Sequence, residues 1–284
     1  MTSMYADANR STVDALRRMA VLLEYDGTDY SGFQTQINAS SIQEHLEISL
    51  YKLTGERHRV AGAGRTDAGV HAHGQVAAFD TWSSIDEHSF STGLNHYLPY
   101  DISVRLAVEV SLDFDPRRWA ISREYRYSIL NRESRSPIYN RFAWHVGPQL
   151  DVNAMNTAGQ YMVGHMDFGP FAKIDMDRLV DTHRDMFACS VIRNGDFVLL
   201  DICANSFLRQ QVRRTAGSLI DVGLGRLTIE EFVGITNCGV NGYANRVAPS
   251  KGLSLMRVNY LTNPFINQSH LSIEKHPAYS ASLV

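Results

Sequence analysis

The sequence predicts an α+β protein of two similar halves, each with a mainly antiparallel sheet. Short apolar runs that end at turn residues are typical of strands, as in 20–25 before Asp26 and Gly27. Other segments carry apolar residues at helical spacing, and the order of strands and helices in the first half recurs in the second. No low-complexity linker separates the halves, so we expect the two domains to share an interface at a central cleft.

In the first half, a strand is expected at 20–25 and a helix from Ser41. Glu44 lies three residues after Ser41, as in a capping box, and the apolar residues that follow repeat at helical spacing. The remaining elements are strands at 58–63, 75–79 and 102–110, a helix at 87–97, and a turn-rich segment at 64–74.

The second half is predicted to hold strands at 125–130, 197–204 and 254–260 and a helix at 152–163. A long helix follows the strand at 197–204. One face of that helix is expected to carry Leu208, Val212, Thr215 and Leu219.

These elements define four expected parts of the chain. They are an N-terminal arm at 1–17, a first α+β domain at 18–112, a second at 113–262 and a polar tail at 263–284.

Composition is that of an ordinary globular protein, with 284 residues, 44% hydrophobic and 20% charged. The net charge of −3 is not that of a strongly basic nucleic-acid binder, so any RNA binding requires a local basic face. The three cysteines are odd in number and widely spaced, which predicts reduced thiols in a cytoplasmic protein. No stretch of the sequence reads as an export signal or a membrane span, so no membrane contact is expected.

One segment carries the candidate chemistry: residues 62–72 read GAGRTDAGVHA. Its glycines permit tight turns and close approach of a ligand, and small neighbours leave the carboxylate of Asp67 accessible. Arg65 and His71 add hydrogen-bond donors nearby. From these residues alone, an aspartate satisfied by backbone amides in a glycine-rich turn is the favoured interpretation.

Residues 64–71 (GRTDAGVH) resemble the signature of the TruA family of tRNA pseudouridine synthases. The similarity continues in the family's order and covers about residues 19–261. The matching stretches are EYDG at 24–27, YSGFQTQ at 30–36, SIQE at 41–44, NHYLP at 95–99, REYRY at 123–127, NSFL at 205–208, Val212 with Arg213, GSL at 217–219 and GLSL at 252–255.

The resemblance implies the pseudouridine synthase fold and a reaction that needs no metal and no cofactor. It implies that Asp67 is the catalytic carboxylate, that Arg213 pairs with it, and that Tyr125 is the active-site tyrosine. Without the resemblance, Tyr125 would be an ordinary strand residue. The resemblance also implies a homodimer that binds tRNA and acts on the uridines at positions 38, 39 and 40 of the anticodon arm.

Two segments are locally basic, each with a net charge of +3: residues 113–145 and residues 206–226. Their arginines are candidates for phosphate contacts, although a solvated arginine-rich surface would have the same composition. The residues expected to bind RNA or the target base are Arg65, Thr66, His71, Arg123, Arg126, Arg209 and Arg214.

Two alternatives stay open at this point. One is a catalytically idle RNA-binding or tRNA-chaperone protein of the same fold, and the other is a related synthase that modifies other tRNA uridines. An unrelated hydrolase is disfavoured because no second carboxylate and no Ser–His pair is placed to assist Asp67. A zinc site is rejected because no histidine pair has the spacing and carboxylate that such a site uses.

Overall fold

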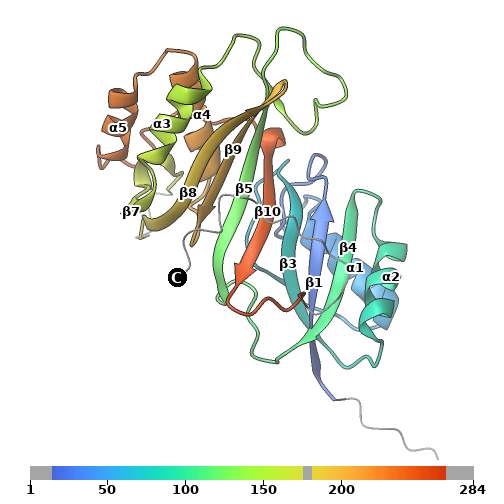
Figure 1. Ribbon diagram of the computed structural model, residues 1–284. Helices are drawn as coiled ribbons and strands as arrows, with labels where there is room; N and C mark the ends of the chain where they lie inside the picture. The colour runs from blue at the N-terminus through green and yellow to red at the C-terminus, as the bar shows by residue number, and fades with distance from the viewer. Residues whose placement is uncertain (1–14, 175–180, 267–284) are drawn as a thin grey trace, which may run out of the picture.

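The computed structural model describes residues 15–174 and 181–266 (Figure 1). The first half contains three long strands, a short strand and two helices. These are β1 (Arg17–Tyr25), α1 (Ile42–Thr54), β2 (Ala61–Gly62), β3 (His71–Thr81), α2 (Glu87–Tyr97) and β4 (Ile102–Val110).

The second half holds the remaining strands, three α-helices and two short 3-10 helices. These are β5 (Ala120–Leu130), β6 (Trp144–His145), α3 (Val152–Gln160), β7 (Gly164–Asp167), η1 (Gly169–Phe171), β8 (His183–Asn194), β9 (Phe197–Ala204), α4 (Gln211–Gly223), α5 (Ile229–Thr236), η2 (Ser250–Gly252) and β10 (Leu253–Tyr260).

The strands form one continuous sheet with the order β4-β1-β3-β10-β5-β9-β8-β7. The α+β class and the mainly antiparallel pairing are therefore confirmed, but the sheets of the two halves are hydrogen-bonded into one. The junction is β10, which pairs antiparallel with β5 and parallel with β3, where Ser254 lies opposite His71 and Leu255 opposite Ala72. The division at residue 112 stays a prediction.

Figure 1 shows the helices in two groups, α1 and α2 beside the first-half strands and α3, α4 and α5 beside the second-half strands. Helix α1 begins where predicted, since the Ser41 side chain accepts a hydrogen bond from the Glu44 amide. It ends at Gly55, whose φ of 77° is a left-handed conformation that glycine adopts without strain. Its buried face carries Ile42, Leu46 and Leu50.

Several predicted elements need correction. The strands expected at 75–79 and 125–130 begin earlier, at His71 and Ala120, so the turn-rich segment is shorter than 64–74. The strand expected at 58–63 is only Ala61–Gly62, because the Glu47 carboxylate binds the Val60 amide and takes the place of a strand partner. Helix α4 begins at Gln211, so Leu208 lies before it and not on its face. The helix at 152–163 ends at Gln160.

Strand β8 and helix α5 were not predicted. Of the two terminal parts, 1–14 and 267–284 lie outside the described residues, and Arg17 is already the first residue of β1. Within 15–174 and 181–266, no helix is long and apolar enough to cross a bilayer.

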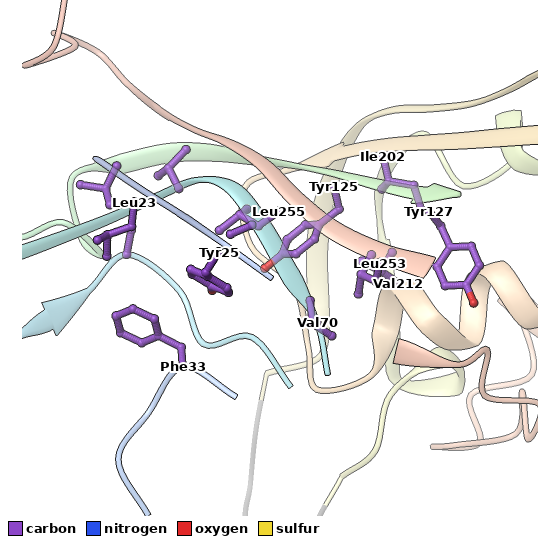
Figure 2. Close-up of a cluster of buried hydrophobic side chains, with 14 of the residues drawn as sticks. Leu23, Tyr25, Phe33, Val70, Tyr125, Tyr127, Ile202, Val212, Leu253 and Leu255 are labelled. Carbon is purple, nitrogen blue, oxygen red and sulfur yellow. The ribbon is translucent and has the colours of Figure 1, made fainter. Parts of the chain in front are cut away.

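Both halves contribute to one hydrophobic core. Figure 2 shows part of it around the junction, where β1 and the 26–40 loop meet β10, β5 and α4. The drawn residues include Tyr25 and Val70 from the first half and Tyr125, Val212 and Leu255 from the second. The segment that carries Asp67 therefore lies where the two halves pack together.

Candidate active site

Asp67 lies in the loop between β2 and β3, and this loop packs on the loop that follows β1. The Phe33 amide donates to the carbonyl of Thr66 (3.2 Å), and the Gly69 amide donates to the carbonyl of Tyr30 (3.1 Å). The two backbones come so close that a Cβ on Gly27 would lie 1.9 Å from the Val70 carbonyl oxygen. Glycine is thus required at position 27, in the loop that supports the Asp67 segment.

Thr66 anchors the loop from inside. Its side chain is buried, and its Oγ1 lies 2.9 Å from the hydroxyl of Tyr25 in β1. Arg65 on one side of Thr66 is exposed, and the Asp67 side chain on the other side is one-third exposed (34%). Thr66 is thus a buried residue between two neighbours whose side chains reach solvent.

The expected contact between Asp67 and Arg213 is present. Nη1 of Arg213 lies 3.4 Å from Oδ2 of Asp67, and the arginine side chain is 17% exposed. Arg213 belongs to the first turn of α4, and its Nε donates to the carbonyl of Ala248 (2.8 Å). The Ala248 amide donates back to the Arg213 carbonyl (3.0 Å). Both the backbone and the side chain of Arg213 are therefore held where the guanidinium contacts Asp67.

Tyr125 lies in the middle of β5 and is buried. Its ring meets Phe207 edge to face, with centroids 5.1 Å apart. Figure 2 shows its hydroxyl pointing toward Tyr25. Among the described residues this hydroxyl has no hydrogen-bond partner. Burial raises the pKa of Tyr125 well above its usual range, and the nearby Tyr25 and Asp67 raise it further. The phenol is therefore protonated at neutral pH.

His71 is buried at the start of β3 and has partners on both ring nitrogens. Nδ1 accepts from the Gly27 amide (3.1 Å), which assigns the proton to Nε2, and Nε2 donates to the carbonyl of Arg141 (2.9 Å). Burial lowers the pKa of His71, so the ring is neutral at pH 7. These contacts give His71 a scaffolding position, and its expected contact with RNA stays a prediction.

The arginines expected to bind RNA occupy three kinds of position: exposed, paired with a carboxylate, or bound to backbone carbonyls. Arg65 and Arg209 are exposed. Arg126 forms a two-pronged ion pair with Asp201, with distances of 2.7 and 2.9 Å. The remaining two bind backbone carbonyls: Arg214 donates to Gly242 and Ala244, and Arg123 is buried within a set of carbonyls.

Sequence reasoning missed two parts of this arrangement. The hydroxyl of Tyr25 holds Thr66, but in the sequence Tyr25 is simply the last residue of an apolar strand. The carbonyl of Ala248 holds Arg213 from 35 residues away, and no local pattern predicts such a contact. In the described part of the chain, no group of three or more His, Cys, Asp or Glu side chains is arranged to hold a metal ion.

Together these residues offer an accessible carboxylate beside a guanidinium, and a buried, protonated phenol in β5. A family model described as tRNA pseudouridine synthase matches residues 21–117 and 158–261. Proteins named tRNA pseudouridine synthase A are similar over most of their length. Those of Geotalea uraniireducens and Geobacter sulfurreducens are 40% and 41% identical over 245 residues, 86% of this chain and 100% of each relative. That of Roseiflexus castenholzii is 43% identical over 252 residues, 86% of this chain and 91% of the relative. This chain, with Asp67 in its GRTDAGVH segment, belongs to the TruA family of tRNA pseudouridine synthases.

Proposed function

We propose that this chain isomerises uridine to pseudouridine in tRNA, at positions 38, 39 and 40 of the anticodon arm. The single observation that carries the chemistry is the carboxylate of Asp67, accessible in its loop and 3.4 Å from the Arg213 guanidinium. Family membership supports the isomerase activity and the tRNA substrate. The choice of positions rests on the resemblance of the sequence to the TruA family.

The reaction breaks the bond between C1′ and N1, turns the uracil, and forms a bond between C5 and C1′. N1 gains a proton and C5 loses one, so the net change is an isomerisation without redox chemistry. Asp67 serves either as the nucleophile at C1′ or as the base that removes a proton at C2′. Both routes use the carboxylate of Asp67, which Arg213 contacts at 3.4 Å.

Tyr125 and Arg65 complete the proposed site. In this proposal the ring of Tyr125 stacks on the uracil, and its phenol oxygen takes the proton from C5 while its own O–H proton passes to water. Arg65 is exposed beside Asp67, where it would hold the extruded base. Extrusion of a stem uridine costs about a few kcal/mol, so a group that holds the flipped base contributes directly to the rate.

One assay tests the activity and the positions together. Purified protein is incubated with unmodified tRNA carrying tritium at uridine C5, and release of tritium to water is measured. We expect release by the wild type, none by Asp67→Ala despite retained tRNA binding, and normal release by Asp29→Ala. Asp29 is a matched control because it is an exposed carboxylate in the neighbouring loop.

Each competing function predicts a different result in this assay. An idle RNA-binding protein would bind tRNA and release nothing. A synthase for other uridines would still release tritium from transcripts with cytidine at 38, 39 and 40. Wild-type release by Asp67→Ala would remove this carboxylate from the mechanism.

The same proposal includes a homodimer with tRNA bound across both subunits, and a location in the cytoplasm. The three cysteines are free thiols, as expected in a reducing compartment. Light scattering at micromolar concentration should give twice the mass of 31.9 kDa, and a mass of one chain would contradict the dimer.

A further inference from the structure

Arg123 is an arginine enclosed by backbone carbonyls. Its side chain is buried in β5, two residues before Tyr125 and on the same face of the strand. Nη1 donates to the carbonyls of Ala120 (3.2 Å) and Asn205 (2.7 Å). Nη2 donates to those of Ala63 (3.0 Å) and Arg117 (2.7 Å). No carboxylate among the described residues pairs with it.

The four carbonyls belong to three segments that are far apart in the sequence. Ala63 precedes the Asp67 loop, Asn205 follows β9, Arg117 lies just before β5, and Ala120 is the first residue of β5. The Ala63 amide donates to the Val76 carbonyl (2.8 Å) in β3, so this residue is held by the first half through its amide and by the second half through its carbonyl.

We propose that Arg123 is a positioning residue for the reaction. It holds the Asp67 loop in a fixed position relative to Tyr125. The inference rests on the proposed function. Ala63 lies four residues before Asp67, and Asn205 lies two residues before Phe207, whose ring packs on Tyr125. One planar guanidinium therefore sets the relative position of both sides of the site.

This position disfavours a direct contact of Arg123 with RNA. Its four Nη hydrogens are used in the four bonds to carbonyls, which leaves only Nε–H. Burial lowers the pKa of Arg123. Burying a cation without a carboxylate costs free energy that an apolar side chain in the same place would not. A lysine has three donors on a single nitrogen and cannot reproduce the planar arrangement.

The test uses the full-length protein and the tritium-release assay, with kcat and KM measured for tRNA. We expect Arg123→Met to lower kcat about 100-fold, because a small displacement of reacting groups has effects of this size. KM and its salt dependence should stay those of the wild type. The kcat of Arg123→Lys should lie between those of the wild type and Arg123→Met. Arg17→Met is the matched control, since Arg17 also donates to two carbonyls, of Ser83 and Ile85, and should keep the wild-type kcat.

Other results would overturn the inference. An arginine that binds phosphate would instead give a raised KM and a salt slope smaller by about one, with kcat unchanged. A purely structural role would lower Tm and leave the kcat of the folded protein unchanged. If Arg123→Met does not fold, Arg123→Lys decides: a wild-type kcat refutes the proposal, and a lower kcat at wild-type KM supports it. Absence of release by the wild type would refute the proposed function itself, whereas full release by Arg123→Met refutes only this inference.

Discussion

The two halves of the molecule contribute to the site in different ways. The first half supplies Asp67 from a loop whose backbone is held by another loop and by the buried Tyr25–Thr66 contact. The second half supplies Tyr125 from the middle of a strand and Arg213 from the first turn of a helix. The carboxylate is one-third exposed, whereas Tyr125 is buried.

The first half thus provides a side chain that solvent can reach, and the second half provides side chains held rigidly by regular elements. A loop rich in glycine lets the backbone approach a substrate closely, and regular elements hold their side chains with little freedom. The carboxylate that we propose to react therefore lies on the accessible side, and its proposed partners, Arg213 and Tyr125, lie on the rigid side. Substitutions on the two sides should then have separable effects on rate and on stability.

The largest effect on the rigid side is expected at Arg213. Arg213→Leu removes the cation beside Asp67, and we expect kcat to fall about 10²–10³-fold, the usual cost of losing one stabilising donor in an active site. Arg213→Lys should lose less, because the charge is retained. Single-turnover tritium release measures both variants. Equal rates for wild type and Arg213→Leu would mean that the 3.4 Å contact has no part in the chemistry.

Two tyrosines in β5 should differ in their effects, since substitution of one should lower kcat and substitution of the other should lower stability. The Tyr125 hydroxyl has no partner in the described part of the chain, so Tyr125→Phe should lower kcat about 100-fold through lost proton transfer and leave Tm unchanged. Tyr127 points away from it in Figure 2 and donates to the carbonyl of Pro249 (2.8 Å). Tyr127→Phe should cost about 1 kcal/mol of unfolding free energy and leave kcat unchanged. A Tyr125→Phe enzyme with wild-type kcat would restrict Tyr125 to stacking on the base.

The last expected effect is on stability alone and concerns the loops of the first half. A Cβ on Gly27 would meet the Val70 carbonyl, whereas one on Gly64 would meet no atom within 4 Å. Gly27→Ala should lower the unfolding free energy by about 1–3 kcal/mol because the backbone must move, and Gly64→Ala should leave it unchanged. Urea denaturation measures both. Equal stability of the two variants would show that the supporting loop moves at no cost.

Local signals in the sequence predicted most elements. Helix α2 and strands β4 and β9 have the predicted bounds, since each is delimited by turn residues or by a capping side chain such as that of Asp86. Strand β8 was missed because its polar and charged ends hide the alternation. Helix α5 was missed although Thr228 and Glu231 form a capping box that the sequence already contains.

Contacts between distant segments were harder to predict. The pairing of Asp67 with Arg213 was expected from the family resemblance, and no periodicity in the sequence implies it. The burial of Arg123 runs against the usual exposure of charged residues, and its partners are backbone carbonyls, which every residue has. The place of β10 between β3 and β5 is likewise a long-range pairing that local patterns do not determine.

The position of β10 has a consequence for biosynthesis. It is the last strand of the described chain, yet it lies between strands made much earlier and is the only one that joins them. While the ribosome is still translating residues before 253, the two halves have no shared strand to hold Asp67 near Arg213. A chain that stops before residue 253 therefore lacks the strand that hydrogen-bonds the two halves into one sheet.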